Sequence, residues 1–137
     1  LRINPSFRED LSEIHRCEPY VYAQMIAGKE AIHPGEAKNS WLTGTAAWNY
    51  VAITQWILGI RPAYDGMIID PVIPAGWDGF TAHRQFRGKQ LEIIVTNPDH
   101  INRGVREINV NGAVIAGNLI PMNTLKQNNR VEVKLHG

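Results

Sequence analysis

The chain has 137 residues, of which 44% are hydrophobic and 20% charged, so it is long enough for one modest domain or parts of two. Its formal net charge of +1 argues against a nucleic acid or an anionic membrane surface as a partner. No apolar run is long enough to span a bilayer or to form a secretory leader, and the lone Cys17 excludes an intrachain disulfide. We therefore expect a globular cytoplasmic protein, and the first residue, Leu1, predicts a fragment or a processed chain.

The first part of the chain has a helical pattern. Pro19 fits the first position of a helix that would run to a stop at Gly28. A loop over residues 29–40 precedes a second helix, which is predicted to open around Thr43 and to run up to a stop at Gly59. Apolar residues cover every face of this second helix, as they do in a buried helix. Two helices cannot bury one of them on all sides, so we expect partner helices outside this chain.

The second part of the chain, after residues 61–65, predicts a small antiparallel β-sandwich. Val131–Leu135 alternates apolar and polar residues, which gives a strand one buried and one exposed face. Arg87–Lys89 and Asn111–Gly112 are hairpin turn signals. The predicted strands are Met67–Asp70, Phe80–Phe86, Leu91–Thr96, Val105–Val110, Val114–Ala116 and Arg130–Leu135.

Two short segments carry polar groups suited to a ligand. Thr43 and Gly44 lie at the N-terminus of the second helix, where unpaired N–H groups and the helix dipole favour a phosphate; the alternative is that Thr43 only caps the helix. Gln24 has an amide that can hold a sugar hydroxyl, or it is a buried glutamine bonded to a neighbouring helix. Four aromatic residues can stack on sugar rings, although their helical spacing is more typical of a core: Trp41, Trp48, Tyr50 and Trp56.

Other kinds of site find no support in the sequence. The five histidines and Cys17 have no metal-ligand spacing, and neither a nucleophile elbow nor a Walker loop is present. The carboxylates at Glu30, Glu36, Asp65 and Asp78 lie in predicted loops, so none is a candidate for a buried catalytic acid. We expect neither a metal nor a cofactor.

Several of these segments together closely resemble the cellobiose and chitobiose phosphorylases of glycoside hydrolase family ninety-four. The resemblance extends from about Glu18 to Gly79 and fades after about Asp99. The segments that carry it are Glu18–Met25, Gly35–Trp48, Ile57–Pro62, Asp65–Gly66, Ile69–Pro71 and Phe86–Gly88.

The resemblance implies an α+β fragment of a larger enzyme. Residues 1–61 would be the last helices of an (α/α)6 catalytic barrel, and residues 62–137 a jelly-roll-like β-sandwich domain at the C-terminal end. The partners it implies are the upstream part of the same enzyme and a second copy in a homodimer.

The resemblance also implies a reaction, in which cellobiose and inorganic phosphate give α-glucose 1-phosphate and glucose with inversion at the anomeric carbon. Thr43 and Gly44 match a Thr-Gly pair that contacts phosphate in the family, and Gln24 matches a glutamine that contacts the sugar. The catalytic aspartate and the basic phosphate ligands would lie upstream, so the chain alone should be inactive. Two alternatives stay open: a phosphorylase of chitobiose or another β-linked glucoside, and a non-catalytic carbohydrate-binding or structural module.

Overall fold

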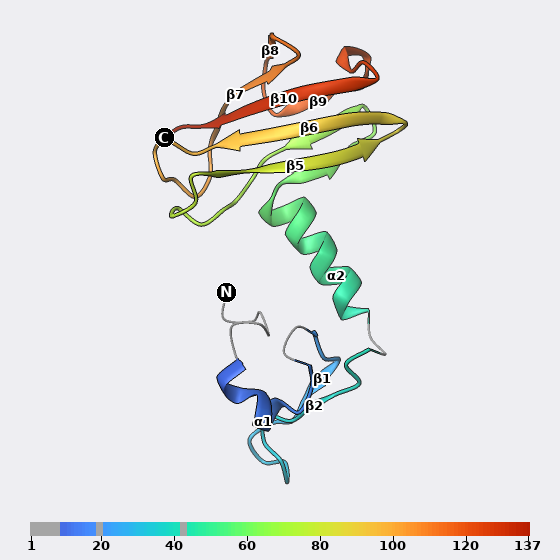
Figure 1. The fold of residues 1–137 in the computed structure, drawn as a ribbon, viewed down its shortest axis with the longest axis vertical. Coiled ribbons are helices and arrows are strands. Elements are labelled where there is room, and N and C mark those ends of the chain that lie inside the picture. The colour runs from blue at the N-terminus through green and yellow to red at the C-terminus, as the bar shows by residue number, and fades with distance from the viewer. Residues whose placement is uncertain (1–8, 19–20, 42–43) are drawn as a thin grey trace. The chain divides into compact units, whose positions relative to one another are not determined.

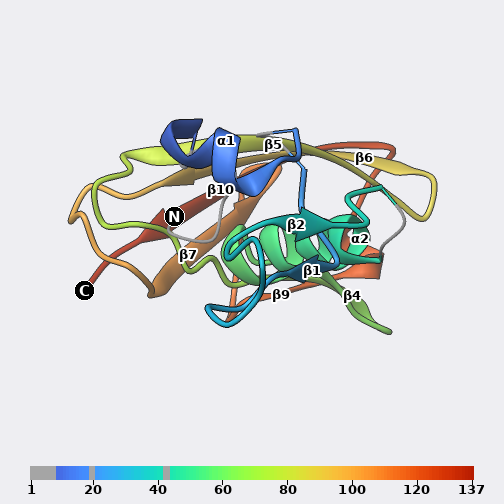
Figure 2. The same cartoon turned by 90° about the horizontal axis from the view of Figure 1, so that it is seen from below.

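A computed structural model describes residues 9–18, 21–41 and 44–137 of the chain. The chain forms two compact units, which divide between Val51 and Ala52. Figures 1 and 2 label the helices and strands of the two units. The N-terminal unit carries short helices and one small pair of strands. The C-terminal unit is mostly sheet, so the described part of the chain is rich in β-structure and has a single helical segment of more than four residues.

The N-terminal unit is built from short elements around a two-stranded ladder. Strands β1 and β2 are antiparallel, with Met25 opposite Lys38 and Ile26 opposite Ala37. The elements are η2 (Glu9–Leu11), α1 (Ser12–His15), β1 (Met25–Ile26), β2 (Ala37–Lys38) and α2 (Thr45–Val51).

The helix predicted from Pro19 to Gly28 is wrong over its described residues, 21–28. This segment contains β1 instead, and its backbone groups pair with the segment after the loop rather than along a helix. The N–H of Ala27 donates to the carbonyl of Glu36 at 2.8 Å, and the N–H of Gly35 donates to the carbonyl of Ala27 at 2.9 Å. The first bond uses the Ala27 N–H, which a helix would need for its own ladder, so long-range pairing overrides the local helical signal.

The second predicted helix is confirmed. Helix α2 is followed directly in sequence by the π-helix η3 (Ala52–Ile57), where the Leu58 N–H donates to the Ile53 carbonyl at 2.8 Å. The stop at Gly59 has φ +69°, and a Cβ there would clash with the backbone carbonyl of Asp70, so only glycine fits. No residue of α2 or η3 is buried. Within each unit, the described residues therefore do not provide the burial expected for this helix.

Two sheets make up the C-terminal unit (Figure 1). The larger has the order β5-β6-β10-β7-β8 and the smaller the order β3-β4-β9. Buried residues of both sheets form one hydrophobic core, with Met67 and Ile120 from the smaller sheet and Ile93 and Val131 from the larger. The elements are β3 (Ile60–Pro62), β4 (Gly66–Ile69), β5 (Gly79–Phe86), β6 (Lys89–Thr96), β7 (Val105–Val110), β8 (Ala113–Ile115), β9 (Leu119–Pro121), η4 (Met122–Thr124) and β10 (Asn128–Leu135).

Both predicted hairpins are present. Arg87 and Gly88 have φ of 48° and 78° and join β5 to β6, while Asn111 and Gly112 have φ of 53° and 91° and join β7 to β8. Two consecutive positive φ angles are typical of the type I′ turn, whose twist matches that of the strands.

The expectation of a wholly antiparallel arrangement is wrong at one pairing. Strand β10 runs parallel to β6, with Val131 opposite Ile93, and antiparallel to β7 on its other side. The last strand therefore lies in the middle of the sheet. A parallel neighbour needs a long crossover connection, and no local turn signal announces it.

Candidate functional site

The N-terminal unit brings the segment around Gln24 beside residues 37–41, which precede Thr43 and Gly44 in the sequence. The β1–β2 pairing aligns the chain around Met25 with the chain around Lys38. Just beyond this ladder, Asn39 Nδ2 donates to Gln24 Oε1 at 3.1 Å. The indole Nε1 of Trp41 donates to Glu18 Oε1 at 2.9 Å. Two side-chain bonds and one strand pair thus join residues 18–26 to residues 37–41.

Gln24 lies in an exposed bend that leads into β1. Its Oε1 accepts the bond from Asn39, and within the described residues its Nε2 has no hydrogen-bond partner. The side chain therefore keeps a free amide donor, which is the kind of group that binds a sugar hydroxyl.

Thr43 lies outside the described residues, so the structure describes only Gly44 of the two residues predicted to bind phosphate. Gly44 is exposed, and its carbonyl accepts the first bond of the helix, from the Trp48 N–H at 3.0 Å. Its φ lies outside the left-handed region, and a Cβ there would make ordinary contact with Trp48 Cδ1 at 3.5 Å. Neither backbone strain nor packing requires glycine at this position. The absence of a structural need for glycine is consistent with a role in which a ligand approaches the backbone at Gly44 closely.

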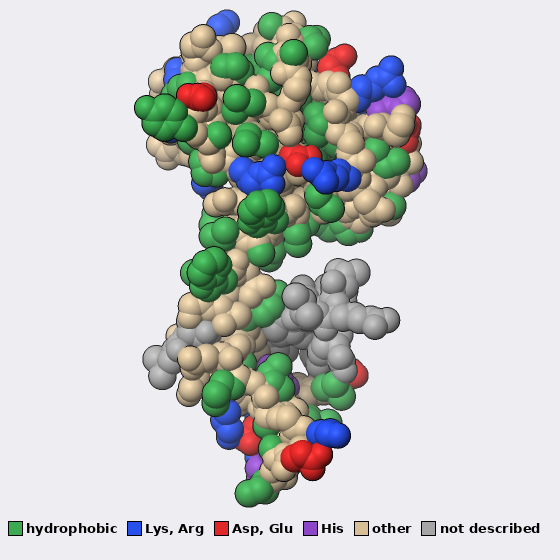
Figure 3. All heavy atoms as spheres, turned by 180° about the vertical axis from the view of Figure 1, so that it is seen from behind, with side chains coloured by type: hydrophobic (Ala, Val, Ile, Leu, Met, Phe, Trp, Pro, Cys, Tyr) green, Lys and Arg blue, Asp and Glu red, His purple; other side chains and the backbone are tan. Residues whose placement is uncertain are grey.

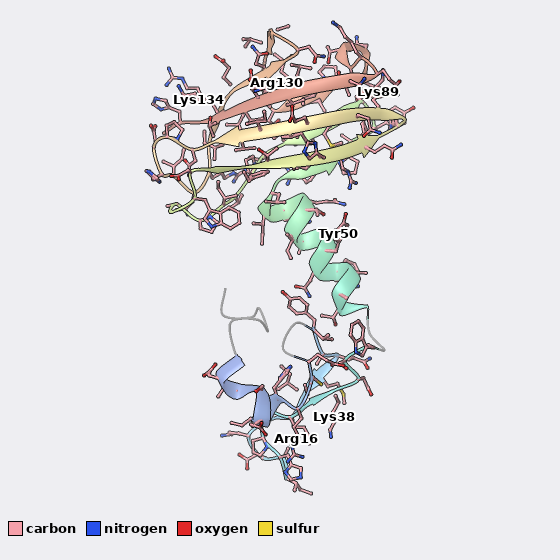
Figure 4. All side chains as sticks on the ribbon, in the orientation of Figure 1. Arg16, Lys38, Tyr50, Lys89, Arg130 and Lys134 are labelled. Carbon is pink, nitrogen blue, oxygen red and sulfur yellow. The ribbon has the colours of Figure 1, made fainter. Side chains whose placement is uncertain are left out.

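Two acidic side chains of this unit, Glu18 and Glu36, have lowered pKa values. The hydrogen bond from Trp41 is the largest cause that lowers the pKa of Glu18. The hydrogen bond from Lys38 is the largest cause that lowers the pKa of Glu36, and the charge of Arg16 acts in the same direction (Figure 4). A general acid for glycosidic cleavage needs a raised pKa. Glu18 and Glu36 therefore do not have the character of a proton donor to a leaving oxygen.

Sequence reasoning did not identify the contacts that connect the two segments, which involve Glu18, Asn39 and Trp41. The residue type of Asn39 was the one usable signal, because asparagine adopts the left-handed region more readily than most residues, and Asn39 has a φ of 55° there.

The aromatic residues Trp41, Trp48, Tyr50 and Trp56 are all exposed. Within the described residues, their interpretation as core residues is therefore not confirmed. Among the described residues, no group of three or more metal-binding side chains occurs, and no helix has the length and apolar character needed to cross a membrane.

The N-terminal part of the chain matches a known protein family. Residues 1–59 match the family described as the glycosyl hydrolase 94 superfamily, catalytic domain. All three candidate residues, Gln24, Thr43 and Gly44, lie inside the matched range. The match covers less than half of the chain, and it shows that this part is similar to a family 94 catalytic domain.

The chain is similar to N,N'-diacetylchitobiose phosphorylase of Vibrio proteolyticus, with 44% identity over 119 residues, which are 87% of the chain and 15% of the relative. It is 43% identical over 113 residues, 82% of the chain and 14% of the relative, to the phosphorylase of the same name in Vibrio furnissii. It is 33% identical over 121 residues, 88% of the chain and 16% of the relative, to the solabiose phosphorylase of Paenibacillus borealis. The chain thus spans only a small part of the length of the curated relatives it matches.

Proposed function

We propose that the chain is the C-terminal portion of an inverting disaccharide phosphorylase. The residues up to about 61 would complete an (α/α)6 catalytic barrel, and the rest would form a β-sandwich domain after it. The observation that carries this proposal is the coincidence of two boundaries. The match to the family 94 catalytic domain ends at residue 59, and the strands of the larger β-rich unit begin at Ile60.

In the proposed reaction a phosphate oxygen bonds to the anomeric carbon while the bond from that carbon to the glycosidic oxygen breaks. The leaving oxygen takes a proton from an acid supplied by the rest of the enzyme, and the product is an α-sugar 1-phosphate. The hydroxyl of Thr43 and the backbone at Gly44 would hold the phosphate where the dipole of the helix favours an anion. The free amide donor of Gln24 would bind a hydroxyl of the reacting sugar.

The relatives favour one substrate over the alternatives. The two Vibrio proteins, at 44% and 43% identity, are named as diacetylchitobiose phosphorylases, whereas the solabiose phosphorylase is 33% identical. We therefore propose N,N'-diacetylchitobiose as the first candidate substrate and cellobiose as the second.

A homodimer and a cytoplasmic location stay predictions. Light scattering on the full-length protein measures whether it is a dimer.

The decisive experiment follows phosphate consumption by the full-length enzyme with each disaccharide. In the same enzyme, Thr43→Val deletes one donor to a charged group, which is worth about 1.5–3 kcal/mol, or roughly 10- to 150-fold in affinity. We expect this loss mainly in the KM for phosphate, with a smaller change in the KM for the disaccharide. An unchanged phosphate dependence would withdraw the phosphate assignment and leave Thr43 as a helix cap. Absence of phosphorolysis with every β-linked disaccharide would favour the non-catalytic module.

A further inference from the structure

The outer face of the larger sheet is polar and hollowed. Buried and exposed residues alternate along β6 and β10, so Gln90 and Glu92 lie on the outer face beside Asn128 and Arg130. A hollow with a volume of about 430 Å3 lies at this place. We call it the amide groove, and its polar rim consists of His83, Gln90, Glu92, Asn111, Asn128 and Arg130.

The strand register arranges these side chains in two rows. His83, Glu92 and Arg130 are opposite one another across β5, β6 and β10 and form a row of ionisable groups. Gln90 is opposite Asn128, and these two form a row of amides. Neighbouring strands lie about 4.8 Å apart, and every second residue of a strand is about 7 Å further along it. Both rows are therefore within reach of one small molecule.

The floor and one end of the amide groove are fixed by hydrogen bonds. Asn129, which lines the groove, is only 5% exposed, and its Oδ1 accepts from Nδ2 of Asn111 at 3.0 Å. The Oδ1 of Asn111 accepts from the backbone N–H of Arg130 at 3.0 Å. These bonds hold the turn between β7 and β8 against β10. A fixed site costs little conformational entropy when a ligand binds.

Three side chains of the rim have free hydrogen-bonding groups. Within the described part of the chain, the side chains of His83, Gln90 and Asn128 make no hydrogen bond. A primary amide offers two N–H donors and a carbonyl acceptor, and a neutral imidazole offers one donor and one acceptor. A sugar hydroxyl also donates and accepts, so these groups complement a polyhydroxylated ring.

The charges of the amide groove do not favour an anionic ligand. Among the described residues that line it, the fixed charges are those of Glu92 and Arg130, which cancel. Arg130 Nη1 lies 3.7 Å from a carboxylate oxygen of Glu92, and its Nε donates to Glu132 at 3.0 Å. An anion would have to compete with both carboxylates for the guanidinium.

An apolar ligand is also disfavoured. Leu91 lines the amide groove but is only 2% exposed, because its side chain belongs to the hydrophobic core. The unit does expose hydrophobic side chains, as Figure 3 shows from behind, but among the described residues none of the large exposed ones lines the groove. The remaining ligand class that fits is a neutral molecule rich in hydroxyl groups.

A second hollow continues the amide groove along the same strands. It has a volume of about 270 Å3, and its lining includes Ile94, Thr96, Glu132 and Lys134. Ile94 lies two residues beyond Glu92, and Glu132 two residues beyond Arg130, so both hollows are on one face of the sheet. The amide groove alone has a volume in the range of about 300–1,000 Å3 that is typical of small-molecule sites. The two hollows together suit a ligand of more than one ring.

We propose that the amide groove binds a neutral saccharide chain, whose hydroxyl groups are held by His83, Gln90 and Asn128. The second hollow holds the next sugar of the chain. This inference goes beyond the proposed function, because the groove belongs to the C-terminal unit, whereas the candidate phosphate and sugar residues belong to the N-terminal one. It does not depend on phosphorolysis.

Photo-crosslinking to the full-length protein tests the proposal. The probe is the β-linked tetrasaccharide of N-acetylglucosamine with a diazirine at its reducing end, used without phosphate so that it is not consumed. Labelled peptides are identified by mass spectrometry, and the unmodified tetrasaccharide serves as competitor. Gln90→Ala removes one free amide. Gln85→Ala is the matched control, because Gln85 is opposite Gln90 on β5 and does not line the groove.

We expect competed labelling of the peptides that contain β6 and β10. Gln90→Ala should raise the half-saturating probe concentration roughly 2- to 13-fold, the value of one neutral hydrogen bond, and Gln85→Ala should leave it unchanged. Thermal melts check that both variants are folded. Three results would overturn the proposal: no label in these peptides, label that the competitor does not reduce, or equal half-saturation in Gln90→Ala and the parent protein. Labelling that appears only when a dimer is diluted to monomer would also overturn it, since a second copy would then cover the groove.

The proposed function and the saccharide site fail separately in this experiment. Competed labelling of the sheet in a protein that catalyses no phosphorolysis would reject only the proposed function. Phosphorolysis in a protein whose label is confined to the N-terminal unit would reject only the saccharide site.

Discussion

The indole Nε1 of Trp41 lies 2.9 Å from Oε1 of Glu18 and donates a hydrogen bond to it. The two residues are 23 positions apart, and each stands at the edge of one of the two ligand-suited segments. This bond therefore helps to set the position of the chain before Gln24 against the chain before Gly44. It also stabilises the carboxylate form of Glu18, whose pKa lies below its ordinary value.

Replacing Trp41 with phenylalanine should raise the pKa of Glu18 toward its ordinary value, because the largest cause of the lowered pKa is removed. A carboxylate with a lowered folded pKa stabilises the fold above its unfolded pKa and loses this contribution as the pH falls through the folded pKa. In Trp41→Phe this contribution, and with it the loss of stability on acidification, should therefore be smaller. A carboxyl NMR titration of the labelled chain measures the pKa. Trp48→Phe is the control and should leave Glu18 unchanged.

Gln24→Ala in the full-length enzyme should lower kcat/KM for the disaccharide by roughly 2- to 13-fold, the value of one neutral hydrogen bond. Gln24 is exposed, so the free energy of unfolding should change by less than about 0.5 kcal/mol. Initial rates and thermal melts measure both. Gln85→Ala, at an exposed position of β5, is the control and should alter neither. A large loss of stability with normal kinetics would instead assign Gln24 a structural role.

Gly44→Ala should raise the KM for phosphate by about 10-fold, because the added methyl group would occupy space that the anion needs near the backbone. The methyl group makes only ordinary contact with Trp48, and the helix start should lose no more than about 1 kcal/mol. Gly28→Ala is the control, since nothing lies within 4 Å of a Cβ at that position. If both variants behave alike in phosphate kinetics, Gly44 does not contact phosphate.

Asn129 should be essential for the stability of the larger sheet. It is 5% exposed, and its side chain bonds the carbonyls of Gln90 and Lys126, the N–H of Lys126 and the amide of Asn111. Asn129→Ala leaves these groups without their partner, and we expect a loss of roughly 1–3 kcal/mol in the free energy of unfolding. Urea unfolding measures it. Asn128→Ala, at the exposed neighbouring position, should cost less than about 0.5 kcal/mol.

Local patterns in the sequence predict much of the C-terminal unit. The alternation in β10 and the turn at Asn111–Gly112 act within a few residues, and the structure confirms the strands and hairpins that they indicate. Strands β3 and β9 have three residues each, too few for a period of two to be recognised. The parallel pairing of β6 with β10 joins residues 38 positions apart, such as Val95 and Val133, and no local signal encodes it.

The N-terminal unit was harder to predict, for a physical reason. Pro19 and Gly28 satisfy the rules for helix ends, but two-residue strands at Met25–Ile26 and Ala37–Lys38 use the same backbone groups. The candidate site residues remain predictions. Gln24 gains a partner in Asn39 that its sequence neighbours did not suggest, while Thr43 lies outside the described residues.

The central place of β10 has a consequence for synthesis of the protein on the ribosome. β10 lies between β6 and β7, so the five-stranded sheet cannot close until Asn128–Leu135 has left the exit tunnel. Until then the nascent chain holds two separate hairpins, β5–β6 and β7–β8, with open edges that can pair with other chains. A premature stop codon before Asn128 would make this state permanent. Such a truncation removes the central strand of the sheet, and it should send the product to aggregation or proteolysis.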